Sequence, residues 1–171
     1  SLGSLQSDGW LGSRPVAMAT PEDTATRARL VIQEWFQRHH IDTQGMLVDN
    51  GSGLSRTGRI APAQLAGVLQ AMQQSPWAPE FQSSLPIAAL DGTMRKRMLN
   101  SPAAARARIK TGTLKNVVAI AGYVPDANNQ LCVVVAMINS DLAGNGNGRA
   151  AVDALIEWVA SSGVVTVSAD Q

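Results

Sequence analysis

The sequence predicts an α+β fold in which an antiparallel sheet is flanked by helices. Three strand-like runs follow one another at 105–111, 117–124 and 131–139. The last two are joined by a short polar loop at 125–130, and strands joined in this way pair antiparallel. Helix-like periodicity precedes and follows the three runs, so the helices are expected to lie against the sheet.

Composition limits the class of protein. The chain has 171 residues and 18.0 kDa, which fits a single domain with one core. Hydrophobic content is 45%, charged content is 16% and the net charge is +1, which argues against nucleic acid or an anionic membrane as a partner. The sequence contains no apolar segment long enough to predict a transmembrane helix. The single cysteine, Cys132, allows no internal disulfide and suggests no metal cluster, so neither a metal nor a cofactor is expected.

The first half of the chain predicts two helices. Residues 1–20 are rich in Ser and Gly and are expected to form a loop or arm. Proline and acids after Thr20 mark the start of a helix that runs to about Arg38. Its apolar stripe has helical spacing and comprises Ala28, Val31, Ile32 and Trp35. Pro62 opens a second helix, with an apolar stripe at Leu65, Val68, Leu69 and Met72, that ends at Ser75-Pro76.

Shorter features lie between and after these helices. Residues 46–48 are a short strand candidate, and 49–53 are a dense turn signal. The stretch 77–101 is expected to be irregular because prolines interrupt it. A glycine-rich connection leads into a final helix from Arg149 to about Ser161. Its apolar residues cover more than one stripe, so deep burial is expected: Val152, Leu155, Ile156, Trp158 and Val159.

The strand at 105–111 carries the main functional signal. Its alternation puts Arg106, Arg108 and Lys110 on one face, and Gly112 removes a side chain where another backbone would approach. A cation, flanking hydroxyls and a bare strand edge could hold a substrate carboxylate and pair with an extended peptide.

The letters Lys110-Thr111-Gly112-Thr113 occur in two protein families. In P-type ATPases they follow a phosphorylated aspartate, but here that position is Ile109, which cannot carry a phosphoryl group. In penicillin-binding proteins and serine β-lactamases, a Lys-Thr-Gly strand lines the acyl-transfer site.

Segments in the expected order support the second family: 49–56, 85–93, 110–114 and 121–123. Together they resemble the D-alanyl-D-alanine carboxypeptidase/endopeptidase family, the class C low-molecular-mass penicillin-binding proteins of peptidase family S13, from about Thr20 to about Val159. The resemblance implies a partial serine β-lactamase/transpeptidase-like fold and a serine-type acyl-enzyme mechanism. It implies peptidoglycan stem peptides as substrates, β-lactam antibiotics as ligands, and a periplasmic or extracytoplasmic location.

The chain departs from the family in its serines. The family acts through Ser-x-x-Lys and Ser-x-Asn, and no serine here begins either motif. Thr93 and Lys96 imitate the first spacing at a place where the family has no nucleophile. The whole chain, 1–171, is therefore expected to be the C-terminal part of one catalytic domain and inactive alone. Its sheet would keep a bare edge, covered by the N-terminal part of the enzyme or by another copy.

The resemblance also implies roles for individual residues. Lys110, Thr111 and Gly112 would belong to the catalytic strand, with Lys110 facing the missing serines. Thr111 and Thr113 would hold the terminal carboxylate through their hydroxyls, and the Thr113 N–H would serve as an oxyanion donor. Arg56 would contact the acidic end of a diaminopimelate side chain.

The residues themselves leave other readings open. Arg56 could instead pair with Asp49 or cap a turn, and Ser52 and Ser55 fit turn residues better than nucleophiles. Asp49 and Asp91 fit carboxylates that order loops. At the level of function, the rivals are a non-catalytic module that binds peptidoglycan peptides and a β-lactamase or esterase of the same superfamily.

Overall fold

A computed structural model describes residues 21–49, 51 and 55–163 of the chain. The helices are α1 (Pro21–Arg38), α2 (Pro62–Gln73), α3 (Ala78–Ser83) and α4 (Asn147–Ser161). The strands are β1 (Arg108–Leu114), β2 (Val117–Pro125) and β3 (Leu131–Asn139). Short 3₁₀ helices lie at η1 (Gly92–Met94) and η2 (Ala143–Asn145). The arm expected at 1–20 lies outside the described residues.

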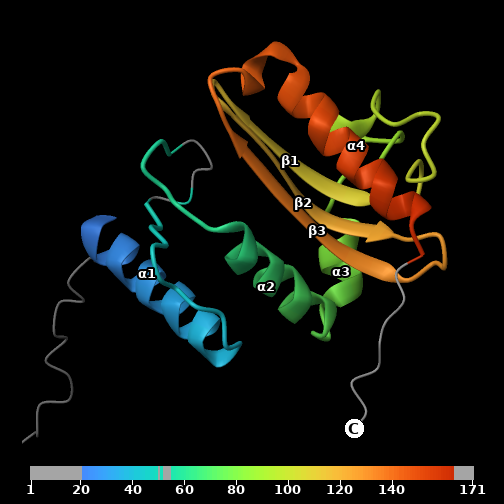
Figure 1. The fold of residues 1–171 in the computed structure, drawn as a ribbon. Helices are drawn as coiled ribbons and strands as arrows, with labels where there is room; N and C mark the ends of the chain where they lie inside the picture. Colours follow the sequence, from blue (N-terminus) through green and yellow to red (C-terminus); the bar gives the residue numbers. More distant parts are fainter. Residues whose placement is uncertain (1–20, 50, 52–54, 164–171) are drawn as a thin grey trace, which may run out of the picture.

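The three strands form one antiparallel sheet in the order β1-β2-β3. Helix α4 lies along one face of the sheet, and α2 and α3 lie on the other face (Figure 1). The predicted α+β fold is confirmed, including the hairpin between β2 and β3. Both β1 and β3 are edge strands, and within the described residues no strand pairs with the outer side of β3.

Each face of the sheet has its own apolar cluster. The larger cluster lies between α4 and the sheet and includes Ile109, Ile120 and Ile156, each at most 1% exposed. The smaller cluster joins α2 to the opposite face through Leu69 and Tyr123. The buried Tyr123 hydroxyl donates to the Leu69 carbonyl at 2.6 Å, so the polar end of this ring is satisfied inside the cluster.

The first strand begins later than the alternation predicted. It starts at Arg108 instead of 105, because the preceding residues form tight turns. Ala105 has a φ of 58°, and its N–H donates to the Ala88 carbonyl at 2.8 Å. Arg106 therefore lies outside the strand, where its guanidinium donates to the backbone carbonyl of Asp126. The prediction that Arg106 shares a strand face with Arg108 and Lys110 is therefore wrong.

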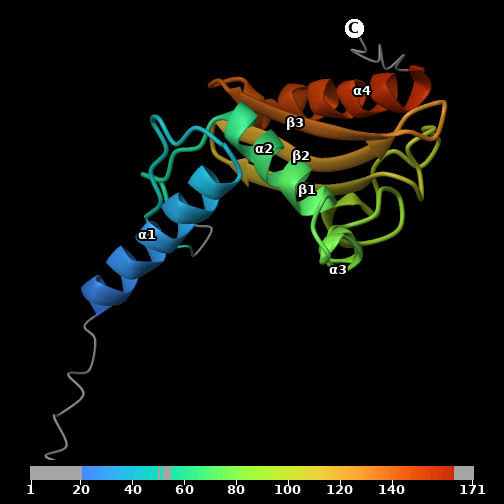
Figure 2. The ribbon, with the colours of Figure 1, turned by 90° about the horizontal axis from the view of Figure 1, so that it is seen from below.

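Two predicted apolar faces are less covered than expected. In α4, Trp158 is 66% exposed, because the sheet receives only the face that carries Val152, Ile156 and Val159. In α1, Val31 is 60% exposed, and Phe36 is the buried apolar residue of this helix. Helix α1 extends away from the sheet (Figure 2). Amphipathic spacing identified the apolar face of each helix but could not identify what covers it.

Smaller elements also differ from the sequence prediction. The strand candidate at 46–48 forms only an isolated bridge between Leu47 and Arg59. The region expected to be irregular at 77–101 contains α3 and η1. Among the described helices, none is both long and apolar enough to cross a membrane.

Candidate functional site

The outer side of β1 is paired only at its beginning. The Ile109 N–H donates to the Pro86 carbonyl at 2.8 Å, and the Ala88 N–H donates to the Ala107 carbonyl at 2.9 Å. From Lys110 onward, no backbone of the described residues pairs with this side of the strand. The segment that carries the Lys-Thr-Gly-Thr letters is therefore an open strand edge.

The direction of the Ile109 N–H fixes which peptide groups this open edge presents. Backbone groups of successive residues in a strand point to opposite sides, so every second residue shares the direction of Ile109. The N–H and C=O groups of Thr111 and Thr113 consequently point outward. Those of Lys110 and Gly112 point toward β2. An extended peptide laid along this edge meets the two threonine backbones.

The side chains of the same strand divide between the two faces of the sheet. Ile109 lies in the cluster under α4, so Thr111 and Thr113 project on the α4 side. Lys110 pairs with Ala121 of β2, which packs in the cluster with α2 and α3. The site therefore presents hydroxyls on one face and an ammonium group on the other.

Lys110 and Gly112 leave their face open. The Lys110 side chain is exposed, and its Nζ donates to the Thr111 carbonyl. A Cβ built on Gly112 would lie 3.7 Å from the Ala119 Cβ, an ordinary contact. The described part of the chain thus gives no steric reason for glycine at 112. The free space lies on the exposed face, where a ligand could approach the backbone.

Gly122 of β2 shows the opposite situation. A Cβ at this position would lie 2.0 Å from the Arg108 carbonyl oxygen and 2.9 Å from the Ile109 Cα. Only glycine allows β1 to approach β2 at this point. Gly122 therefore fixes the position of β1, although the site itself does not include it.

A cavity of about 380 Å³ lies beside the hydroxyls on the α4 side. It is lined by Thr93, Lys96, Arg97, Thr111, Thr113 and Arg149. The Thr93 and Thr111 hydroxyl oxygens are 2.7 Å apart, a hydrogen-bond distance. Sequence reasoning did not connect Thr93, Lys96 or Arg149 with Thr111, because only the tertiary fold brings η1 and α4 to β1.

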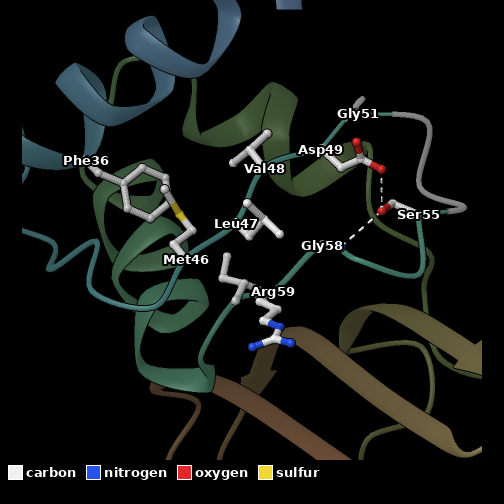
Figure 3. Close-up of a pocket in the computed structure, with 10 residues that line it drawn as sticks. Phe36, Met46, Leu47, Val48, Asp49, Gly51, Ser55, Gly58 and Arg59 are labelled. Atoms are coloured by element: carbon white, nitrogen blue, oxygen red, sulfur yellow. Dashed lines mark hydrogen bonds between the residues drawn. The ribbon is translucent and has the colours of Figure 1, made fainter. Parts of the chain in front are cut away.

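Arg56 does not line the cavity beside Thr111, and it follows Ser55, which lines a pocket between Phe36 of α1 and the 46–60 segment (Figure 3). The pocket has a volume of about 300 Å³. Within it, the Ser55 hydroxyl donates to Asp49 at 2.6 Å and accepts from the Gly58 N–H at 3.0 Å. Ser55 is therefore a turn residue, as predicted, whereas Ser52 lies outside the described residues. Arg56 is exposed and makes no ion pair with Asp49 among the described residues.

Two acids have the loop-ordering role that the sequence suggested. The Asp91 carboxylate accepts the Ile87 N–H and so fixes the loop that pairs with the start of β1. Among the described residues, the Asp49 carboxylate accepts the hydroxyls of Ser55 and Thr57.

Burial raises the pKa of two side chains that lie away from the open edge, Cys132 and Tyr123. Burial and then the nearby Asp126 carboxylate raise the pKa of the Cys132 thiol, which makes this β3 residue a poor nucleophile. Among the described residues, no group of three His, Cys, Asp or Glu side chains could hold a metal ion.

Comparison with known proteins decides the family. The model of the D-Ala-D-Ala carboxypeptidase 3 (S13) family matches residues 14–162. The chain belongs to this family. The D-alanyl-D-alanine carboxypeptidase of Actinomadura sp. strain R39 is 32% identical over 118 residues, which cover 66% of this chain and 22% of that protein.

Solved structures agree with this S13 membership. Penicillin binding protein 4 of Haemophilus influenzae matches with a TM-score of 0.62 and 28% identity, covering 67% of this chain and 26% of that one. A predatory endopeptidase of Bdellovibrio bacteriovorus matches with a TM-score of 0.61 and 15% identity, covering 84% of this chain and 42% of that one; this likeness shows the fold alone. The chain spans about a quarter of the length of the Actinomadura carboxypeptidase and of penicillin binding protein 4.

Proposed function

We propose that this S13 chain supplies the substrate-positioning half of a serine-type DD-peptidase site that cuts D-Ala-D-Ala peptides of peptidoglycan. The observation that supports it best is the open edge of β1 at Thr111 and Thr113. An acyl-D-Ala-D-Ala peptide is extended and ends in a carboxylate. The edge offers backbone pairing for the peptide and hydroxyls for the carboxylate.

Each residue of the strand has a distinct role in this proposal. The Thr111 and Thr113 hydroxyls hold the terminal carboxylate, and the outward Thr113 N–H stabilises the oxyanion that forms when the scissile carbonyl is attacked. Lys110, on the opposite face, lends positive potential to the attacking serine. Gly112 keeps that face clear for substrate. Arg56 contacts the acidic end of a diaminopimelate side chain.

The attacking group must come from elsewhere in the enzyme. The 171-residue sequence contains neither Ser-x-x-Lys nor Ser-x-Asn. We therefore expect the chain alone to neither hydrolyse D-Ala-D-Ala peptides nor form an acyl-enzyme with penicillin. An N-terminal part of the same enzyme, or another copy, would supply the serines and cover the outer edge of β3. The substrate is cell-wall peptide, so the proposed location is extracytoplasmic or periplasmic.

β-Lactams are the second ligand class of the proposal. A solved complex of H. influenzae penicillin binding protein 4 with a β-lactam matches this chain with 28% identity and a TM-score of 0.62. β-Lactams carry a carboxylate next to their reactive amide, so the same hydroxyls would orient them.

The experiment begins with the coding sequence directly upstream of Ser1. If it encodes Ser-x-x-Lys and then Ser-x-Asn, the protein from the complete reading frame is incubated with fluorescent penicillin and, separately, with acyl-D-Ala-D-Ala. We expect a covalent adduct and D-Ala release from that protein and neither from the 171-residue chain. In that protein, T113V should slow D-Ala release about tenfold or more, because a hydrogen bond to a charged group is lost.

The matched control is T26V, on the exposed surface of α1, which should release D-Ala at the parent rate. A penicilloyl adduct on the 171-residue chain alone would contradict the proposal. A start codon at Ser1, combined with D-Ala-D-Ala affinity without hydrolysis, would favour the non-catalytic binding module.

A further inference from the structure

The cavity beside Thr111 and Thr113 has a strongly positive lining. Three of its six lining residues are cations, Lys96, Arg97 and Arg149, and none of the six is an acid. The three come from two separate segments: Lys96 and Arg97 follow η1, whereas Arg149 belongs to α4. Their convergence on one cavity is a product of the tertiary fold.

Arg97 is already neutralised. Its Nη2 and Nε both donate to the carboxylate of Asp153, which lies in α4. This two-point pairing satisfies Arg97 and links the η1 segment to α4. Lys96 and Arg149 are different. Both are exposed, and neither has an ion pair within the described part of the chain. Two uncompensated positive charges therefore remain at the cavity that holds the hydroxyls.

The position of Arg149 is unfavourable for the fold itself. Arg149 lies in the first turn of α4, whose aligned peptide dipoles repel a cation, and this turn has no acidic side chain. Stability alone would favour Asp or Glu there. A bound anion would compensate Arg149, Lys96 and the positive end of α4 together.

We propose that Lys96 and Arg149 form the cationic wall of the carboxylate subsite and bind the terminal carboxylate of acyl-D-Ala-D-Ala jointly with the Thr111 and Thr113 hydroxyls. This inference rests on the proposed function. Thr93 is a positioning residue, because its hydroxyl lies 2.7 Å from that of Thr111 and orients it toward the carboxylate. The wall makes a C-terminal carboxylate, rather than an amide, the required end of the substrate.

The experiment is an amide-resolved NMR titration of the 171-residue chain with three peptides: N-acetyl-D-Ala-D-Ala, its C-terminal amide, and N-acetyl-L-Ala-L-Ala. We expect the first peptide to shift the Thr111 and Thr113 amide signals and to bind about tenfold more tightly than the amide. K96Q and R149Q should each weaken carboxylate binding about three- to fivefold, the effect of one exposed charge pair, and leave amide binding unchanged.

Two further variants act as controls. R95Q removes an exposed cation next to Lys96 that does not line the cavity, so it should bind the carboxylate as the parent chain does. R149K should retain most of the affinity, because it keeps the charge. For Thr93, T93S should retain the parent carboxylate affinity and T93V should not, which separates hydroxyl orientation from a loss of packing.

The outcomes separate this inference from the proposed function. Parent affinity for the carboxylate in both K96Q and R149Q would overturn the cationic wall while leaving the peptidase proposal intact. The absence of shifts at Thr111 and Thr113 with any carboxylate peptide would also overturn the wall. Equal binding of the D,D and L,L peptides, with both variants still weakened, would support the wall and contradict the D-Ala-D-Ala substrate.

Discussion

The sheet with α4 and the region around α1 use apolar residues in different ways. Ile156 of α4 has no exposed surface, and it packs with Ile109 and Ile120 in one cluster. Val31 of α1 is 60% exposed, although it lies on an equally regular apolar stripe. The apolar faces of the sheet and α4 cover each other, whereas no described residues cover most of the apolar stripe of α1.

This difference separates the parts of the chain that stabilise the fold from the parts that present surface. The inner edge of β1 and the underside of α4 are buried and should tolerate little change. The outer edge of β1 and the stripe of α1 are exposed and should change with little effect on stability. Four substitutions test this division by urea unfolding of the 171-residue chain.

G122A should have the largest effect. The added Cβ would lie 2.0 Å from the Arg108 carbonyl oxygen, and backbone cannot move aside as a flexible side chain can. We expect a loss of more than about 4 kcal/mol in the free energy of unfolding, which is in the exceptional range for one substitution. The matched control is G112A, whose Cβ would meet only Ala119 at 3.7 Å. Equal losses in the two variants would contradict the close approach at Gly122.

I156A should come next. Ile156 is fully buried between α4 and the sheet, so the substitution leaves a cavity as well as losing apolar burial. We expect a loss of about 3 kcal/mol. W158A, two positions along the same helix, removes a larger side chain that is 66% exposed and should cost much less. If W158A were the more destabilising variant, the assignment of the buried face of α4 would be wrong.

Y123F should have a moderate effect with a distinctive pH dependence. It leaves the buried Leu69 carbonyl without its hydroxyl donor, a loss of about 1–2 kcal/mol. Burial raises the pKa of Tyr123, so the native state keeps its proton when the unfolded chain loses it above the usual value of 10.0. The parent chain should therefore lose stability as the pH rises through and above this value. Y123F should lack that part of the slope; an unchanged alkaline slope would show that Tyr123 does not cause it.

V31S should have the smallest effect. Val31 contacts solvent over most of its surface, so we expect a change within about 0.5 kcal/mol. A matched substitution in the covered region is V152S in α4, where the side chain is 1% exposed. There a loss of several kcal/mol follows because two buried methyl groups are replaced by one buried hydroxyl. A loss above about 1 kcal/mol in V31S would show that the α1 stripe is covered in solution.

The local features of the fold were predictable from the sequence, whereas the packing was not. Proline and helical spacing located α2, and continuous apolar runs located β2 and β3, because these signals are local. The start of β1 was predicted wrongly because Ala105 adopts a positive φ. Alanine rarely takes this conformation, so the sequence does not predict it. Exposure of Trp158 depends on which face of α4 meets the sheet, and no local pattern records that.

The candidate site divides along the same line. The Lys-Thr-Gly-Thr letters identified Thr111 and Thr113, and strand alternation then separated them from Lys110. Lys96 and Arg149 had no signal of their own, because their relation to Thr113 exists only after η1, β1 and α4 have packed together. A sequence motif cannot detect cations that are far apart in the chain and come together only in the folded structure.

Successive side chains of β1 point to opposite faces of the sheet, so the number of residues before Lys110 decides which face its ammonium group takes. Because Arg108 is held against Gly122, one residue added between Arg108 and Lys110 would turn the ammonium toward α4 and the hydroxyls toward α2. Two added residues would restore both orientations but would displace Lys110, Thr111 and Thr113 along the strand. Length changes in this stretch should therefore be permitted in even steps and rejected in odd ones, whatever the residues are.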